Sequence, residues 1–287
     1  TAYEIPKRDW SSDVCSSDLR DWGQQMLVEN RVGAGGTIAG AFVAKAPPDG
    51  YTLLHCNIAT NAIALAVYTK LQYDGIKDFA PITRMGVTAN AFLVHPSMPT
   101  KTMQEFVQYA RANPGKLSYG HGGVGASPQL SMELLKTMAK INLVHIAYKG
   151  ASPAIADLIG GQIPVAIANL PALVSHIKTG KVRALAVSSE KRVPQVSDVP
   201  TMIESGFPDY VVYAWYGACA PAGTPPPVLE KLHTDITRVM NSPDVKGRLN
   251  ELVVDVATQG REEFTNFMRN EATRWAKVVK DAGIPPQ

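Results

Sequence analysis

Long hydrophobic runs are missing from this chain of 287 residues. A transmembrane helix needs roughly 18 to 20 consecutive apolar residues, and no window of the sequence approaches that length, so we expect no direct insertion into a membrane. Runs of lysine and arginine are missing as well, although the formal net charge is +3. Nucleic-acid binding usually relies on such basic clusters, so we expect no nucleic-acid partner, whereas a mild basic bias is compatible with small anionic ligands.

Cysteine is scarce, with three residues in the chain. Cys56 and Cys219 each lie in an apolar, strand-like run, and neither has the C-x-x-C or Cys/His spacing of a redox or metal site. Cysteines in such runs are usually small buried hydrophobic side chains, so we expect free thiols. A disulfide between Cys56 and Cys219 stays open if their two strands are neighbours.

The motifs of common catalytic and metal sites are missing too. The six histidines are scattered without the H-E-x-x-H spacing of a zinc site, and the G-x-S-x-G elbow of serine hydrolases does not occur. No pair of carboxylates is placed for acid-base catalysis. We therefore expect no metal and no cofactor, and an enzyme is the weaker hypothesis for the function.

The first 19 residues read differently from the rest of the chain. Serine, aspartate and arginine crowd together there without helical or strand periodicity, and most of the segment resembles the conceptual translation of a DNA-sequencing adaptor. We interpret residues 1–19 as a non-native, adaptor-like segment and exclude them from the fold prediction, as one would a fusion scar.

From residue 24 onward, short apolar runs alternate with helical patterns, which predicts an α/β fold with mostly parallel sheets. The expected strands cover residues 26–29, 51–56, 91–94, 117–119, 143–147, 165–168, 184–188 and 211–218. The expected helices cover residues 37–45, 102–112, 127–139, 151–159, 171–179, 201–205, 226–241, 243–252 and 261–281.

Two proline-rich, helix-free segments, 94–100 and 215–227, are typical of passages between domains. They predict a central domain inserted into a discontinuous outer one. We expect a first domain of residues 20–97 plus 216–287 and a second domain of residues 98–215.

The most informative segment is residues 117–135, which reads as a strand, a glycine-rich turn and an amphipathic helix. Its glycines allow backbone conformations that other residues avoid and let a ligand approach the main chain. The helix start that follows, at Ser127, offers unpaired N–H groups and a partial positive charge. The pattern therefore predicts an anion-binding turn. The four glycines are Gly120, Gly122, Gly123 and Gly125.

Two nucleotide-binding motifs fit this turn in part. The P-loop spacing matches from Gly120 to Ser127, but Ala126 stands where a lysine must reach the phosphates. The dinucleotide pattern G-x-G-x-x-G also fits, but the next strand ends in Lys149 without the acidic residue that binds a ribose. A cytoplasmic α/β enzyme that binds a nucleotide or dinucleotide at Gly120–Gly125 is the alternative function, and a plain turn without a ligand is a third interpretation.

Polar side chains follow several expected strands, at the edge where ligands bind in open α/β sheets. Asn57 and Thr60 follow one such strand, Tyr148 a second and Asn169 a third. The two asparagines and the threonine have a second interpretation, because such residues also cap helices. His121, inside the glycine turn, either donates a hydrogen bond to a bound carboxylate or points outward.

Several short segments together resemble one protein family. They are residues 28–37 (VENRVGAGGT), 46–53 (APPDGYTL), 77–81 (KDFAP), the glycine turn, 148–150 (YKG), 160–162 (GGQ), 198–201 (DVPT) and 220–225 (APAGTP). In this order and spacing they resemble the extracytoplasmic receptors of tripartite tricarboxylate transporters, the Bug or TctC-like solute-binding proteins. The resemblance covers residues 28–285.

This resemblance implies a two-domain periplasmic-binding-protein fold of type II, a Venus flytrap that closes on its ligand without covalent chemistry. It also implies a small carboxylate as ligand, membrane permease subunits as partners, a monomer, and a periplasmic location although the sequence shows no signal peptide. The glycine turn corresponds to the ligand loop of the second domain. The expected ligand-binding residues are Asn57, Thr60, Gly120, His121, Gly122, Gly123, Val124, Gly125, Ala126, Ser127, Tyr148, Ala168 and Asn169.

Three departures from the family pattern bear on binding. The first strand and its Pro-Gly-Gly ligand loop are expected to be missing, so we predict that the chain as written folds poorly or binds weakly. Relatives often carry histidine at the position of Gln129 and an acidic residue at that of Ala168. Without that acid a cationic or amino-acid-like ligand lacks a partner, and a plain mono- or dicarboxylate fits better.

Overall fold

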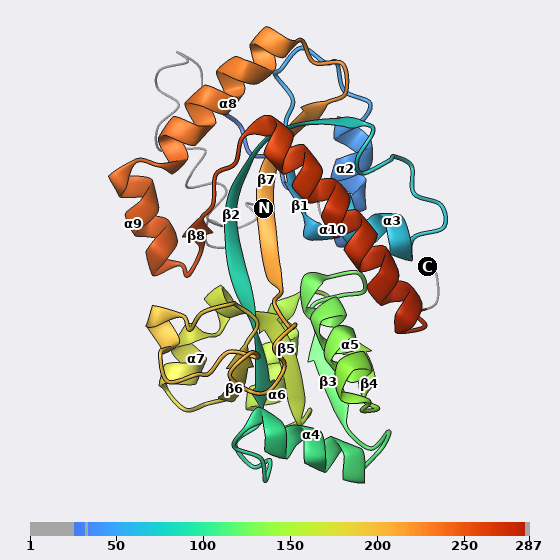
Figure 1. Ribbon diagram of the computed structural model, residues 1–287, viewed down its shortest axis with the longest axis vertical. Helices are drawn as coiled ribbons and strands as arrows, with labels where there is room; N and C mark the ends of the chain where they lie inside the picture. The colour runs from blue at the N-terminus through green and yellow to red at the C-terminus, as the bar shows by residue number, and fades with distance from the viewer. Residues whose placement is uncertain (1–25, 32–33, 285–287) are drawn as a thin grey trace, which may run out of the picture.

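The computed structural model describes residues 26–31 and 34–284. The adaptor-like segment 1–19, and with it the position of the expected first strand and first ligand loop, lies outside the described residues. Figure 1 shows two groups of strands and helices arranged along the long axis of the molecule. They are joined by the strands β2 (Phe79–Val94) and β7 (Tyr213–Pro221), which run along that axis.

The upper sheet in Figure 1 is antiparallel, with β7 between β1 and β2 and with β8 on the far side of β2. Its short strands are β1 (Leu54–Asn57) and β8 (Asp255–Val256). Its helical elements are the 3-10 turn η2 (Ala34–Gly36), α2 (Thr37–Val43), the π-helical turn η3 (Ala59–Ile63), α3 (Ala64–Val67), α8 (Pro226–Met240), α9 (Pro243–Glu251) and α10 (Arg261–Asp281).

The lower sheet is mixed. β3 pairs in parallel with both β4 and β5, whereas the end of β2 pairs antiparallel with β5 and β6. Its strands besides β2 are β3 (Ser118–His121), β4 (Val144–Ala147), β5 (Val165–Asn169) and β6 (Arg183–Val187). Its helical elements are α4 (Met103–Ala112), α5 (Ser127–Ala139), α6 (Ala151–Ile159), η4 (Leu170–Ala172), α7 (Val174–Lys178) and η5 (Pro194–Val196).

Strand β2 passes from one sheet to the other within a single run of residues. Ala89 is its last residue paired with β7, opposite Tyr213, and Asn90 is its first residue paired with β5, opposite Asn169. The chain returns to the upper sheet where β7 begins at Tyr213. Both connections between the sheets therefore lie side by side at the middle of the molecule.

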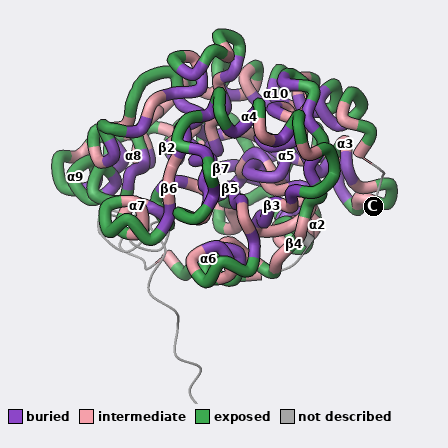
Figure 2. Tube along the Cα trace, turned by 90° about the horizontal axis from the view of Figure 1, so that it is seen from below, coloured by how far each residue is buried: buried purple, intermediate pink, exposed green. Residues whose placement is uncertain are grey.

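Alternation along β7 sorts its residues between two layers, because successive side chains of a strand point to opposite faces. Ala218 and Ala220 join the cluster under α8 and α9, whereas Trp215 and Cys219 join the larger cluster under α10. Gly217 lies on the α10 side, and a Cβ there would lie only 2.4 Å from the ring of Phe264. Figure 2 shows the buried residues gathered along these central strands and exposed residues on the outer helices.

Helix α10 buries a stripe that recurs every three or four residues, as a helix packed on a sheet requires. The stripe contains Phe264, Met268 and Trp275, but it also contains Glu271. A buried carboxylate is costly unless it is paired. The Oε2 atom of Glu271 accepts hydrogen bonds from the indole N–H groups of Trp215 at 3.1 Å and Trp275 at 3.0 Å, which ties α10 to β7.

The expected α/β class is confirmed, but the sheets are not mostly parallel, since the upper one is antiparallel and the lower one is mixed. Among the described strands, five pairings are antiparallel and two are parallel. The reason is β2, whose residues 79–90 were not expected to form a strand. Pro81 and Gly86 interrupt its pattern, and the pairing of β2 with β7 shifts register at both places, which lets a strand accommodate them.

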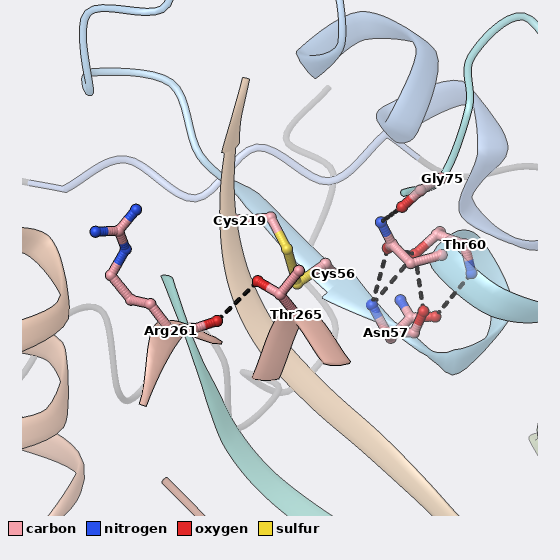
Figure 3. Close-up of a disulfide and its surroundings, with 8 residues drawn as sticks. Cys56, Asn57, Thr60, Gly75, Cys219, Arg261 and Thr265 are labelled. Atoms are coloured by element: carbon pink, nitrogen blue, oxygen red, sulfur yellow. Dashed lines mark hydrogen bonds between the residues drawn. A yellow bond between two sulfur atoms is a disulfide. The ribbon is translucent and has the colours of Figure 1, made fainter. Parts of the chain in front are cut away.

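The expectation of free thiols is wrong, because Cys56 and Cys219 form a disulfide with their Cα atoms 5.9 Å apart (Figure 3). The two strands are antiparallel neighbours in which Leu54 lies opposite Cys219 and Cys56 lies opposite Gly217. The cysteines are thus diagonal neighbours on one face, within reach of each other. Strand order decides this geometry, and the sequence pattern carried no information on strand order.

Other local differences are small. Thr102 caps α4, because its hydroxyl oxygen accepts a hydrogen bond from the Glu105 N–H at 3.1 Å. The strand expected at residues 26–29 is irregular, and the helix expected at 171–179 is split into η4 and α7. None of the helices in the described part of the chain is both long and apolar enough to span a bilayer.

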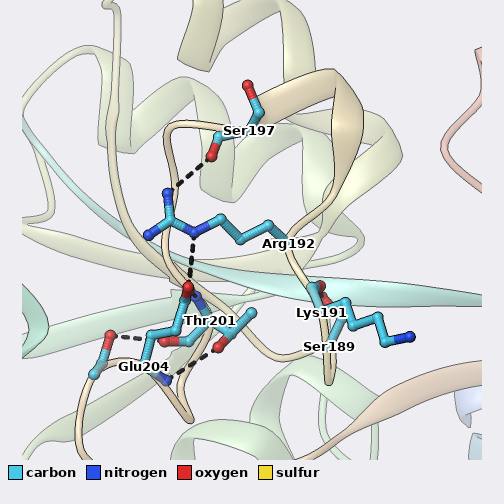
Figure 4. Close-up of polar contacts among 7 residues, drawn as sticks. Ser189, Lys191, Arg192, Ser197, Thr201 and Glu204 are labelled. Atoms are coloured by element: carbon cyan, nitrogen blue, oxygen red, sulfur yellow. Dashed lines mark hydrogen bonds and ion pairs between the residues drawn. The ribbon is translucent and has the colours of Figure 1, made fainter.

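The helix expected at 201–205 is only a turn, in which the Ser205 N–H donates to the Thr201 carbonyl at 3.0 Å and side chains add further hydrogen bonds (Figure 4). Glu204 accepts from the Thr201 N–H at 2.8 Å, and Thr201 accepts from the Glu204 N–H at 3.1 Å. Arg192 donates to the same carboxylate at 2.9 Å and to the Ser197 carbonyl at 3.1 Å. The Thr201 N–H and Arg192 together lower the pKa of Glu204.

Candidate functional site

The glycine turn leaves β3 at His121 and ends at Ser127, the first residue of α5. Gly123 and Gly125 have φ angles of 138° and 76°, in the region that favours glycine. A side chain at Gly122 would be crowded, because a Cβ there would lie 3.0 Å from the Ala151 amide nitrogen. These positions require glycine, which leaves the main-chain N–H groups of the turn uncovered by side chains of their own.

Helix α5 begins without a side-chain cap. Its N-cap residue, Ala126, is extended and has no side-chain acceptor. Gln129 partly compensates, because its Oε1 atom accepts from the Gly125 N–H at 2.7 Å. The N–H groups of Ser127 and Gln129 have no acceptor within the described part of the chain. Unpaired N–H groups and the partial positive charge of a helix start together favour an anion at this position.

His121 is fully buried and does not point outward. Its Nδ1 atom lies 2.9 Å from the Gly123 carbonyl oxygen, which can only accept, and 3.3 Å from the Gly123 nitrogen, and the shorter contact favours the tautomer with the hydrogen on Nδ1. Its Nε2 atom faces Nδ1 of His145 at 3.3 Å. Burial lowers the pKa of His121 to about 4, and the Gly123 carbonyl opposes this shift. Both ring nitrogens are thus engaged within the protein, where His121 supports the turn.

Residues of the upper half of the molecule lie close to this turn. A Cβ on Gly35, in the turn that starts α2, would lie 3.8 Å from the Val124 carbonyl oxygen and 3.6 Å from the Tyr68 hydroxyl. A Cβ on Gly125 would lie 3.8 Å from Ile63 of η3. Sequence reasoning did not list Gly35 or Tyr68 as site residues, although the Gly-Gly pair before α2 was a usable signal.

The turn after β1 is capped by its own side chains. Oδ1 of Asn57 accepts from the N–H groups of Ala59 at 2.9 Å and Thr60 at 3.1 Å. The hydroxyl oxygen of Thr60 lies 3.2 Å from the Asn57 N–H and 2.6 Å from Oδ1 of Asn61, to which it donates. Asn61 donates in turn to the Gly75 carbonyl at 2.9 Å. The capping interpretation of Asn57 and Thr60 therefore describes their contacts.

Asn169 does not cap the helical turn that follows it. Its Nδ2 atom donates to the hydroxyl oxygen of Tyr216 at 3.0 Å, which joins β5 of the lower sheet to β7 of the upper one. Tyr216 lies opposite Asn57 in the β1 to β7 pairing, and burial raises its pKa. Ala168, the neighbouring predicted residue, is buried in the lower sheet. Of the two predicted asparagines, Asn169 is therefore the one whose side chain bonds Tyr216.

Tyr148 supports the glycine turn from the side of β4. Its N–H donates to the His121 carbonyl at 2.9 Å, and two residues later the Gly150 N–H donates to the Gly122 carbonyl at 3.1 Å. The Tyr148 hydroxyl points away to Asp157, to which it donates at 2.7 Å. Its contribution is therefore the position of its backbone. In residues 26–31 and 34–284, no three His, Cys, Asp or Glu side chains gather to hold a metal ion.

Comparison with known proteins gives one consistent family. The model of the tripartite tricarboxylate transporter family receptor matches residues 14–284. Protein BugT of Bordetella pertussis is 33% identical over 279 residues, which cover 96% of this chain and 85% of BugT.

Two solved structures of similar proteins contain carboxylates. Rpa4515 of R. palustris, solved with adipate, is 33% identical with a TM-score of 0.89, and the match covers 97% of this chain and 93% of that one. MatC from Rhodopseudomonas palustris, solved with bound malate, is 32% identical with a TM-score of 0.84, and the match covers 94% of this chain and 93% of that one.

Proposed function

Because this chain belongs to the tripartite tricarboxylate transporter receptor family, we propose that it captures a small carboxylate and releases it unchanged. Binding is the whole of its activity in this proposal, without catalysis. The adipate and malate bound by two related proteins support a plain mono- or dicarboxylate as the ligand class. Ala168, which adds no acidic group to the site, supports the same class over amino-acid-like ligands.

One observation carries the proposal: the uncapped start of α5. The N–H groups of Ser127 and Gln129 point out of the helix without an acceptor among the described residues, next to the turn that begins α2. A carboxylate oxygen matches these donors in charge and in hydrogen bonding. The proposed site keeps the other predicted ligand residues, from Gly120 to Ala126 with Asn57, Thr60, Tyr148, Ala168 and Asn169.

The ligand acts by favouring a closed arrangement of two lobes, since a ligand shifts an equilibrium only by binding one state better. The lobes proposed are residues 20–97 plus 216–287 and residues 98–215. The change of strand partner between Ala89 and Asn90 supports an outward connection within β2, and the start of β7 at Tyr213 supports a return connection nearby. Two neighbouring strands that pass from one lobe to the other are suited to act as a hinge.

The proposed location is the periplasm, with the permease subunits of a transporter as partners and a monomer as the working form. The family consists of periplasmic receptors. The disulfide between Cys56 and Cys219 supports this location independently, because structural disulfides persist in oxidising compartments such as the periplasm. A cytoplasmic enzyme that binds nucleotides at Gly120–Gly125 is disfavoured, because Ala126 supplies no cation to a phosphate.

A thermal-shift screen of the full chain tests the proposal. Adipate, malate and further mono- and dicarboxylates are compared with ATP and NAD, and dimethyl adipate serves as a control of equal length without carboxylate charge. We expect one or more free acids to raise the melting temperature by mass action, with no effect of the diester. Stabilisation by a nucleotide alone would overturn the proposal. Recovery of the ligand unchanged after incubation tests the absence of chemistry.

A further inference from the structure

Asn90 occupies the point at which β2 leaves one sheet and enters the other. It is fully buried, and its N–H donates to the hydroxyl oxygen of Ser188 at 2.8 Å while its carbonyl accepts from the Ser188 N–H at 2.9 Å. The Ser188 hydroxyl donates in turn to the Val212 carbonyl at 2.5 Å, directly before β7. Ser188 therefore holds both connections between the sheets, and Asn90 is the member of this group that reaches α5.

The side chain of Asn90 bonds two serines on one face of α5. Its Nδ2 atom donates to the hydroxyl oxygen of Ser127 at 3.0 Å and to that of Ser131 at 2.7 Å. Its Oδ1 atom is buried without a partner among the described residues. The reversed amide would leave both N–H hydrogens unpaired instead of one carbonyl oxygen, so the orientation with Nδ2 toward the serines is the better satisfied one.

This orientation determines where the serine hydroxyl hydrogens point. Each hydroxyl oxygen already accepts from Asn90, so its own hydrogen must be donated elsewhere. Ser131 can donate to the carbonyl one helical turn earlier, that of Ser127. For Ser127 the corresponding carbonyl belongs to Gly123, outside the helix, and it already accepts from His121 at 2.9 Å and from the Ala126 N–H at 3.3 Å. The Ser127 hydroxyl is thus the free donor at the uncapped helix start.

We propose that Asn90 is a positioning residue that aims the Ser127 hydroxyl hydrogen at the bound carboxylate without touching the ligand. The inference rests on the proposed function, because it names a donor for the same ligand. Both connections between the sheets then contact α5. Asn90 does so from β2, and the Tyr210 hydroxyl, just before β7, donates to the Ser131 carbonyl at 2.5 Å. Opening of the lobes at Asn90 therefore displaces the helix that holds the anion.

The decisive variant is Asn90→Asp, tested by isothermal titration of the full chain with adipate and with malate. A carboxylate of the same shape can only accept, so it takes the Ser127 hydroxyl hydrogen away from the ligand and adds negative charge beneath it. We expect affinity to fall roughly tenfold or more near pH 7. The loss should shrink toward pH 5, relative to the unmodified chain at the same pH, because a buried carboxyl protonates readily and then donates.

Ser131→Ala and Ser127→Ala are a matched pair, since each removes one hydroxyl that Asn90 contacts. Ser127→Ala should weaken binding roughly fivefold or more, and Ser131→Ala should stay within about twofold of the unmodified chain. Equal losses in the two variants would overturn the proposal, because they would indicate general helix packing. An Asn90→Asp affinity within about twofold of the unmodified chain, or a loss independent of pH, would overturn it as well.

Hydrogen exchange of the free protein separates this proposal from the proposed function. If neither adipate nor malate binds the unmodified chain, the proposed function fails for these ligands. The contact between Asn90 and α5 can still be measured. We then expect Asn90→Ala to accelerate amide exchange in residues 127–135 and to leave α4, on the same lobe, unchanged. Unchanged exchange in residues 127–135 would overturn the role of Asn90 without reference to any ligand.

Discussion

Two turns in this molecule have the same place in the fold but opposite chemistry. The turn after β1 opens η3, and the turn after β3 opens α5. In the first, the Asn57 side chain accepts from the Ala59 and Thr60 N–H groups. In the second, Ala126 has no side chain that can accept, and the Ser127 N–H has no acceptor among the described residues. The side chain of Asn57 thus pairs N–H groups of the first turn, whereas the second turn leaves an N–H group without a partner among the described residues.

The comparison teaches that a polar residue after a strand is not by itself a sign of binding. Asn57 and Thr60 are the more polar pair, yet their hydrogen bonds are used within the turn. The glycine turn offers fewer side-chain groups but more unpaired main-chain donors. For an anion held by N–H groups, the missing cap is the informative feature.

Removal of the disulfide beside the turn after β1 should cause the largest loss of stability among the variants compared. Cys56 directly precedes Asn57, and the Cys56 to Cys219 bond closes a loop with a sequence separation of 163 residues. The double variant Cys56→Ala with Cys219→Ala should lose roughly 2–5 kcal/mol of unfolding free energy, measured by urea denaturation. Carboxylate affinity of the folded protein should change little, since the glycine turn lies on the other sheet.

A double variant as stable as the unmodified chain would contradict this prediction. The unmodified chain under reducing conditions provides the control, because it breaks the bond without changing the side chains. A large loss of affinity at unchanged folding would show that the two turns are not independent.

Acid should lower the folding stability of the protein through His121, which lies in the glycine turn. Burial lowers the pKa of His121 from 6.5 to about 4, against the smaller effect of the Gly123 carbonyl, with His145 lowering it further and Glu133 opposing. The unfolded chain therefore binds a proton first, so this contribution to stability is complete above pH 6.5 and is lost as pH falls toward 4. The shift corresponds to ~3 kcal/mol across that window. Urea midpoints across this pH range measure it.

The variant His121→Gln should remove most of this pH dependence, since glutamine can donate to the Gly123 carbonyl but does not titrate. A pH dependence equal to that of the unmodified chain would assign the effect to other groups. The folded variant should keep its carboxylate affinity, because both ring nitrogens of His121 already have partners within the protein.

A side-chain cap added to α5 should convert the open turn into a closed one. Ala126→Asp places an acceptor at the N-cap of α5, where it competes with the ligand for the helix N–H groups and repels it. Affinity for adipate or malate should fall roughly tenfold, which is about 1.4 kcal/mol, as measured by isothermal titration. Ala126→Asn, a neutral cap, should lose less. Affinity unchanged in both variants would place the ligand elsewhere.

Removal of the Asn57 cap from the turn after β1 should have the smallest effect, and that effect should be on stability. Asn57→Ala leaves the Ala59 and Thr60 N–H groups without their acceptor, which should cost about 1 kcal/mol of stability. Asn57→Asp keeps the acceptor and should retain most of the stability. Denaturation curves compare the two, and a greater loss in Asn57→Asp than in Asn57→Ala would contradict the capping role.

Much of the architecture was predictable from local patterns. The alternation of apolar runs with helical stripes predicted the α/β class, and the helix expected at 102–112 is α4. The glycine turn was predictable because residues 120–125 combine glycines with a helix start. Each of these features depends on neighbours in the sequence, which a pattern records directly.

The remaining features depend on residues far apart in the chain. The antiparallel pairing of β2 and the disulfide follow from strand order, which joins Cys56 to Cys219. The contact of His121 with His145 joins two neighbouring strands, so the sequence left open whether His121 binds a ligand or points outward. The capping of Asn57 and the contact of Asn169 with Tyr216 were likewise decided by packing. The adaptor-like segment and the domain boundaries stay predictions.

The most direct test of the account is a titration followed by amide nitrogen NMR on the full chain. Adipate or malate, whichever the thermal screen selects, should shift the Ser127 and Gln129 amide resonances most strongly, as expected for N–H groups that gain a charged acceptor. The Ala59 and Thr60 amides, already bonded to Asn57, should move least among the residues around the site. Large shifts at Ala59 and Thr60 with none at Ser127 and Gln129 would contradict the central claim that the uncapped helix start holds the carboxylate.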